Sequence, residues 1–178
     1  MLGFRIFGDG PERVMVLHDW TSDSRSYRRL ISFLDPGRFS YVFPDLTGYC
    51  LSRHLTRDCT LAEISEDCAV LADQLGWDRH HLVGHSMTGT AAQRIACDRG
   101  PRIQSLVAIC PMSAAGSGAG PEAMTFFRQT THDDGAFRRL IGSRSPSLSS
   151  TSSPLVLLRL APPPRAGVVP ADRWGRTN

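Results

Sequence analysis

The stretch Leu82-Val83-Gly84-His85-Ser86-Met87-Thr88-Gly89 joins an apolar segment to a segment with helical spacing. Its core is close to G-x-S-x-G, a pattern in which a sharp strand-to-helix turn exposes the serine above the edge of a sheet. Gly84 leaves room for neighbouring backbone, and the Met87 amide opens the expected helix, facing the position where an oxyanion would form. Thr88 stands at the fifth position, so the strict pattern is broken. Taken alone, the stretch fits equally well a plain turn rich in small residues.

Strand-like and helix-like segments alternate on both sides of this turn. A capping box, Thr60-Leu61-Ala62-Glu63, predicts the start of the clearest amphipathic helix. The expected strands are 14–17, 39–43, 80–83 and 105–110, and the expected helices are 22–34, 61–75, 87–97 and 122–141. Short links between alternating strands and helices imply right-handed crossovers and an α/β fold with a parallel sheet covered on both faces.

Two further segments follow expected strands. His18-Asp19-Trp20 comes after the first strand, where the Trp20 amide would supply a second oxyanion donor and the His18 ring would bond to nearby backbone. The segment 45–52 follows the second strand and begins with Asp45. The Asp45 carboxylate would either brace this loop or act as a catalytic acid, and bracing is the simpler interpretation.

In this order, the blocks 18–20, 45–52 and 84–89 resemble the α/β-hydrolase superfamily, in its serine-nucleophile branch, from about Arg13 to Ile141. There the blocks usually read H-G-x, D-x-x-G-x-G-x-S and G-H-S-M-G-G. This chain departs from them at Asp19 and Cys50, where glycine is usual, and at Thr88.

The resemblance implies a parallel-sheet hydrolase core flanked by helices. It also implies that Ser86 attacks an ester-like or other acyl bond of a small-molecule substrate and forms an acyl-enzyme. The backbone amides of Trp20 and Met87 would hold the oxyanion, and no metal or organic cofactor is implied.

The catalytic acid and histidine that should follow the serine are hard to place. In this fold the order is serine, acid, histidine, yet the one histidine after Ser86 is His132, followed directly by Asp133 and Asp134. The one acid between Ser86 and His132 that could serve is Asp98. We expect both triad partners to be missing and activity to be impaired. The alternative is a non-catalytic truncated product or a ligand-binding module on a hydrolase scaffold.

Composition changes abruptly after Ile141. Residues 142–178 hold half of the 12 prolines, and their five arginines and one acid give a net charge of +4, whereas residues 1–141 carry −1. We therefore expect a partial hydrolase domain over 1–141, with a cap starting at about 112–141, and a disordered, low-complexity tail over 142–178. A frame slip in a GC-rich gene would produce such a tail, and the C-terminal strands of the fold would then be lacking.

Composition also narrows the classes of partner and compartment. All 20 basic residues are arginine. Because the positive excess lies in the tail, nucleic-acid binding is not indicated for the main body. An Arg-rich tail that contacts RNA or acidic surfaces is a third hypothesis. No apolar run approaches the roughly 20 residues of a membrane span, and residues 1–5 show no apolar core of signal-peptide length, so we expect a cytoplasmic protein. Five cysteines without a C-x-x-C pair argue against a disulfide framework or a zinc site. The sequence does not indicate an oligomeric state.

Overall fold

The computed structural model describes residues 1–113, 120–130, 133–143 and 156–159. The chain divides into two compact units, one of Met1–Met112 with Pro154–Asn178 and the other of Ser113–Ser153.

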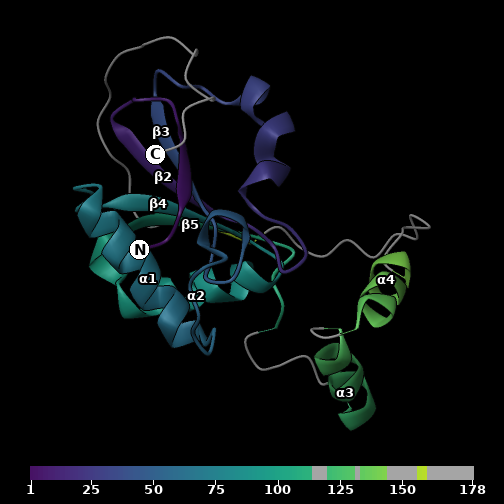
Figure 1. Ribbon diagram of the computed structural model, residues 1–178. Coiled ribbons are helices and arrows are strands. Elements are labelled where there is room, and N and C mark those ends of the chain that lie inside the picture. The colour runs from purple at the N-terminus through teal and green to yellow at the C-terminus, as the bar shows by residue number, and fades with distance from the viewer. Residues whose placement is uncertain (114–119, 131–132, 144–155, 160–178) are drawn as a thin grey trace. The chain divides into compact units, whose positions relative to one another are not determined.

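A six-stranded sheet forms the centre of the first unit, in the order β1-β3-β2-β4-β5-β6 (Figure 1). Its four inner strands are parallel, whereas β1 pairs antiparallel with β3 and β6 pairs antiparallel with β5. The strands are β1 (Phe4–Phe7), β2 (Glu12–Leu17), β3 (Phe39–Pro44), β4 (His80–His85), β5 (Ile103–Ile109) and β6 (Val156–Arg159). The expected parallel sheet of an α/β fold is confirmed.

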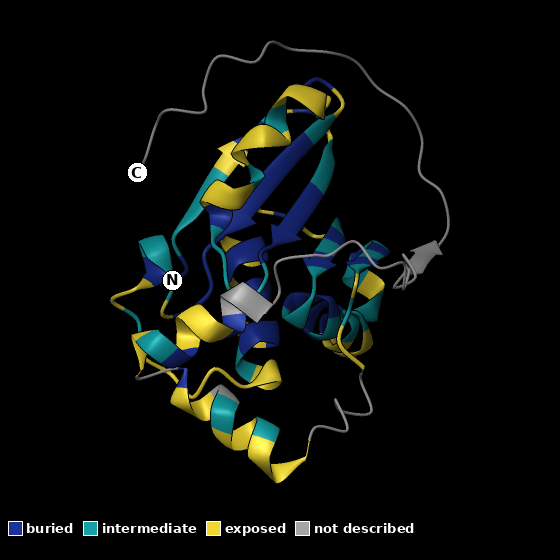
Figure 2. Cartoon of the chain, turned by 90° about the vertical axis from the view of Figure 1, so that its right-hand side faces the viewer, coloured by how far each residue is buried: buried dark blue, intermediate teal, exposed yellow. Residues whose placement is uncertain are grey.

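Two α-helices, α1 (Leu61–Gln74) and α2 (Met87–Asp98), cover one face of this sheet (Figure 1). The predicted capping box is present, with the Thr60 hydroxyl accepting from the Glu63 amide and the Glu63 carboxylate accepting from the Thr60 amide. Leu71 of α1 and Ile95 of α2 pack with Leu82 of β4 in one buried cluster. Figure 2 shows that the strands of the sheet are largely buried, whereas much of the outer surface of the helices is exposed.

The opposite face is covered near β2 and β3 by two short 3₁₀-helices, η1 (Ser24–Arg29) and η2 (Ile31–Phe33). Tyr27 and Ile31 pack there against a cluster that includes Phe43. The prediction of one amphipathic helix over 22–34 is therefore wrong in its type. Polar side chains bond locally, since Asp23 accepts from the Arg25 amide and the Ser26 hydroxyl donates to the Asp23 carbonyl, 2.6 Å away. Such short-range bonds compete with an α-helical turn.

The second unit contains α3 (Pro121–Gln129) and α4 (Asp134–Ser143). The hydrophobic spacing predicts one continuous helix over 122–141, but the structure divides it into two helices. The Asp133 carboxylate accepts from the amides of Gly135 and Ala136, at 2.7 and 3.1 Å, and so caps the start of α4. The Asp133 carboxylate therefore serves as a helix cap.

The expected low-complexity tail lies mostly outside the described residues. One part of it departs from the expectation of disorder, because Val156–Arg159 form β6 and pair with β5 in the register Leu106↔Leu158. None of the helices in the described ranges is long and apolar enough to cross a membrane.

Candidate active site

The candidate site lies where the order of strands reverses. The chain passes from β2 outward to β3 and then back across β2 to β4, so that β2 and β4 are neighbours with Leu17 opposite Gly84. Ligands of open α/β sheets bind at such a switch point, beyond the carboxyl ends of the strands. The segments that leave this edge are His18–Trp20 after β2 and Ser86–Met87 after β4.

Ser86 has the backbone conformation of a tight strand-to-helix turn. Its φ of 56° and ψ of −115° lie in a region that residues with a Cβ rarely adopt. The Ser86 amide donates to the Ile109 carbonyl at 2.9 Å, and the Ser86 carbonyl accepts from the Gly89 amide at 3.0 Å. These bonds to β5 and α2 hold the strained residue, whose side chain is partly exposed.

Gly84 is required because α2 passes very close to β4. A Cβ at position 84 would lie 2.2 Å from the Thr88 carbonyl oxygen and 2.7 Å from the Thr88 carbonyl carbon. No side chain fits against backbone at that distance. The expectation that Gly84 leaves room for neighbouring backbone is confirmed.

Thr88 fits the elbow through its hydroxyl group. It is fully buried, and its Oγ1 accepts from the His85 amide at 3.0 Å. The same oxygen lies 3.1 Å from both the Leu17 and the His85 carbonyl oxygens, to either of which its single proton can be donated. The departure from glycine is therefore accommodated by hydrogen bonds at the join between α2, β4 and β2.

The loop after β2 is held by the buried ring of His18. The Leu46 amide donates to His18 Nε2 at 3.1 Å, which requires the tautomer with the proton on Nδ1. Nδ1 then donates to the Asp19 carbonyl oxygen at 2.7 Å. Because that carbonyl belongs to the same peptide group as the Trp20 amide, the ring fixes the direction of this amide. The expected bonding of His18 to backbone is confirmed.

Tyr49 holds the other side of Trp20. Its hydroxyl donates to the Trp20 carbonyl oxygen at 2.9 Å. Burial raises the pKa of Tyr49 to about 12, so the phenol remains a proton donor at neutral pH. Sequence reasoning missed this residue because only the tertiary fold brings it to the loop.

Asp45 braces the neighbouring loop. Its carboxylate is fully buried and accepts from the Ser24 amide at 2.7 Å, the Ser24 hydroxyl at 3.2 Å and the Leu51 amide at 3.2 Å. Asp23, Asp45 and Cys50 bring possible metal-ligand atoms within 4.8 Å of one another. Both Asp45 oxygens, however, already accept bonds from the protein.

Cys50 and Asp19 also stand where glycine is usual, and their backbone conformations differ. Cys50 has a φ of 29°, in the left-handed region that favours glycine. Asp19 is not among the described residues with positive φ. Position 19 therefore tolerates a side chain without backbone strain.

No histidine of the described chain is hydrogen-bonded to the Ser86 hydroxyl. Asp98 at the end of α2 pairs with Arg94, whose Nε lies 2.9 and 2.8 Å from its two carboxylate oxygens, and His132 lies outside the described residues. The neighbouring His85 points its Nδ1 toward Asp19 Oδ2 at 3.5 Å. Sequence reasoning missed this pair, which crosses from the elbow to the loop after β2.

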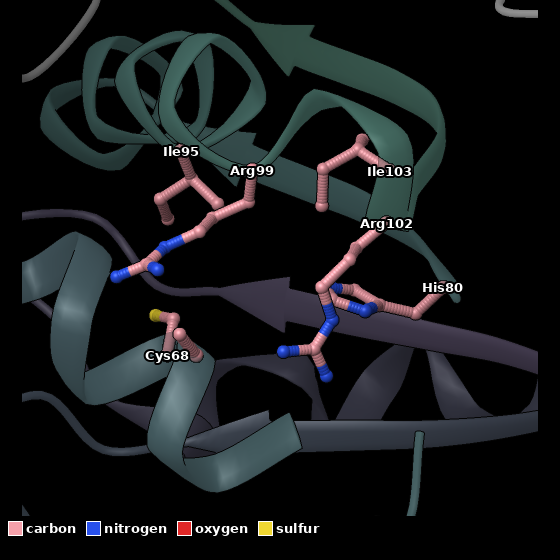
Figure 3. A pocket seen from close by; sticks show the side chains of 7 residues that line it. Cys68, His80, Ile95, Arg99, Arg102 and Ile103 are labelled. Carbon is pink, nitrogen blue, oxygen red and sulfur yellow. The ribbon is translucent and has the colours of Figure 1, made fainter. Parts of the chain in front are cut away.

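A small pocket lies at the opposite ends of the same strands, lined by His80, Ile103, Cys68, Ala69, Ile95, Arg99 and Arg102 (Figure 3). His80 and Ile103 are the first residues of β4 and β5. Arg102 forms an ion pair with Asp73 at 2.7 Å. Because active sites of this architecture lie at the carboxyl ends of the strands, the pocket is not the candidate active site.

Comparisons with known proteins agree with this architecture. A family model described as alpha/beta hydrolase fold matches residues 12–176. The pimeloyl-[acyl-carrier protein] methyl ester esterase of Nitrosomonas europaea is 34% identical over 102 residues, which cover 57% of this chain and 38% of that protein. A human serine hydrolase-like protein is 33% identical over 101 residues, covering 55% of this chain and 48% of that protein. The chain thus spans less than half the length of these relatives.

Solved structures show the same fold at lower identity. A hydrolase from Pseudomonas aeruginosa PA01 superposes with a TM-score of 0.66 and 21% identity, covering 83% of this chain and 59% of that one. The enol-lactonase from Burkholderia xenovorans LB400 gives a TM-score of 0.65 and 20% identity, with 80% and 54% covered. With the family match extending over most of its length, this chain belongs to the alpha/beta hydrolase fold family.

Proposed function

We propose that this chain is a serine hydrolase that cleaves an ester-like bond of a small molecule through an acyl-enzyme on Ser86. The observation that carries the proposal is the conformation of Ser86, with φ 56° and ψ −115°, directly between β4 and α2 at the switch point. A serine strained in this way lifts its hydroxyl away from the surrounding backbone. The esterase-type relatives support an acyl bond as the target.

The proposed reaction needs donors for the negative charge that develops on the acyl oxygen. Ser86 Oγ bonds to the acyl carbon while its proton passes through solvent to the leaving group, whose bond to that carbon breaks. Water then attacks the same carbon, releases the acid and returns a proton to Ser86 Oγ. The Met87 amide is suited to this task, because it opens α2 and has no acceptor within the helix. The Trp20 amide would be the second donor, since its peptide is held by His18. Loss of one such donor commonly costs about 100- to 1,000-fold in rate.

Turnover by the described residues alone is expected to be slow. Without a positioned histidine, a serine retains roughly 10³–10⁴-fold acceleration over water from the oxyanion donors and binding. Among the described residues, no histidine is bonded to the Ser86 hydroxyl, and this favours a second candidate, a ligand-binding module on the hydrolase scaffold. In that case a small acyl compound would bind at the switch point without reacting.

A fluorophosphonate probe tests the first proposal, because it modifies activated serines covalently. We expect labelling of wild type at Ser86, located by peptide mass spectrometry, and none in Ser86→Ala. Ser26→Ala is the matched control, since Ser26 is an exposed serine on η1. Absence of labelling between pH 6 and 9, or labelling at another serine, would refute the proposal. Saturable binding of p-nitrophenyl acetate without acylation would support the binding module instead.

A further inference from the structure

The Asp19 carboxylate contacts both the loop that contains Trp20 and the turn that contains Ser86. Its Oδ1 accepts from the Thr21 amide at 2.6 Å and from the Thr21 hydroxyl at 3.1 Å. Its Oδ2 lies 3.5 Å from His85 Nδ1. A glycine at position 19 would make neither contact.

The contact with Thr21 closes a short ring around Trp20. The Asp19 side chain bonds two residues ahead, as in an Asx turn. The Asp19 carbonyl is bonded to the His18 ring, and the Trp20 carbonyl is bonded to Tyr49. The peptide groups on both sides of Trp20 are therefore fixed, which also fixes the direction of its amide.

The contact with His85 joins this loop to the elbow. His85 directly precedes Ser86, and its own amide is bonded to Thr88 Oγ1 at 3.0 Å. Because this bond holds the His85 backbone, the position of the imidazole is closely tied to the position of Ser86. The Asp19 and His85 side chains are 22% and 38% exposed, so water partly screens the contact between them.

Resting on the proposed function, we infer that Asp19 and His85 are positioning residues that fix the Trp20 amide relative to the Ser86 hydroxyl. Neither residue touches the reacting atoms in this role. In this role, Asp19 makes contacts that the glycine usual at this position cannot make. The alignment of the two proposed oxyanion donors then depends on a side-chain contact across the switch point.

The kinetics of fluorophosphonate labelling separate alignment from binding. We expect Asp19→Gly and His85→Gln each to lower the labelling rate at saturating probe by about two- to fivefold, the range of a partly exposed polar contact, without changing the half-saturating concentration. The double variant should be no slower than the slower single one, because both changes remove the same contact. Asp19→Asn keeps an acceptor for Thr21 but loses the negative charge, so it should resemble His85→Gln more than Asp19→Gly.

Asp73→Asn is the matched control, because it removes a carboxylate paired with Arg102, at the opposite ends of the strands from the candidate site. It should label at the wild-type rate. Additive effects in the double variant, or unchanged rates in both single variants, would overturn the positioning role.

A second measurement does not depend on reactivity. In His85→Gln, the amide NMR resonances of Trp20 and Thr21 should shift and their hydrogen exchange should accelerate, although the substitution is distant in sequence. Unchanged resonances and exchange would contradict the inference even if Ser86 reacts. Absence of labelling in wild type would instead refute the proposed function, and the amide measurements would still decide whether the pair positions the loop.

Discussion

The hydroxyl oxygen of Thr88, in the first turn of α2, lies 3.1 Å from the carbonyl oxygen of Leu17, the last residue of β2. The same oxygen accepts from the His85 amide. One buried side chain thus connects the helix after the elbow to the strand that leads to Trp20.

Thr88→Val keeps the shape of the side chain but removes these bonds. The partly buried His85 amide would lose its acceptor, and we expect the free energy of unfolding to fall by about 1–3 kcal/mol in urea titrations. Thr88→Ser retains the hydroxyl and should lose less. Equal stability of the valine variant and wild type would show that the hydroxyl contributes nothing.

Gly84→Ala should be strongly destabilising. The new Cβ would meet the Thr88 backbone at 2.2 Å, so α2 must move away from β4. We expect a loss of about 2–3 kcal/mol, in the range of overpacked cores, measured by thermal or urea unfolding. Gly100→Ala is the matched control, since a Cβ at position 100 would meet no atom within 4 Å and the φ of Gly100 is not positive. A similar loss in both variants would rule out the close approach as the cause.

The strain at Ser86 predicts an unusual order of stability. Ser86→Gly should be more stable than Ser86→Ala by about 1 kcal/mol, because glycine adopts the positive φ of 56° without a Cβ clash. At Ser26, which is outside the positive-φ region, glycine should instead be the less stable substitution. The two pairs of unfolding free energies provide the check. If Ser86→Gly proved less stable than Ser86→Ala, a Cβ at position 86 would cause no backbone strain.

Acid should destabilise the protein through His80. This residue is 3% exposed, neither ring nitrogen has a hydrogen-bond partner among the described residues, and burial lowers its pKa from 6.5 to about 4. The unfolded chain therefore takes up this proton more readily than the folded one. Stability is fully present above pH 6.5 and is lost as the pH falls toward 4, by about 3 kcal/mol at most.

Urea titrations between pH 7.5 and 4.5 would measure this loss. His80→Leu should flatten the profile, because it removes the titrating group from the same buried position. His54→Gln, at an exposed histidine, should leave the profile as in wild type. If the free energy of unfolding of His80→Leu fell with pH as steeply as that of wild type, the acid sensitivity would come from other groups.

The elements that were predicted correctly are those whose local signals coincide. The Thr60 capping box, the apolar spacing of α1 and the glycine-rich turn after β4 each encode their structure within a few residues. The strand β1, the bond from Tyr49 to Trp20 and the contact between Asp19 and His85 arise only when segments distant in the sequence meet. At the site, the strained turn at Ser86 was predictable from the motif, whereas the side chains that hold the Trp20 loop were not. The division of the expected helix over 22–34 shows local polar bonds prevailing over hydrophobic spacing.

The switch point has a consequence for how this chain can be varied. Ser86, Met87 and Trp20 all belong to the unit Met1–Met112, whereas α3 and α4 belong to Ser113–Ser153. Under the proposed function, the residue that reacts and the two amides that bind the oxyanion lie within the first 112 residues. Substitutions in α3 and α4 should therefore leave the strained turn at Ser86 unchanged, and the two units can be varied separately by mutagenesis.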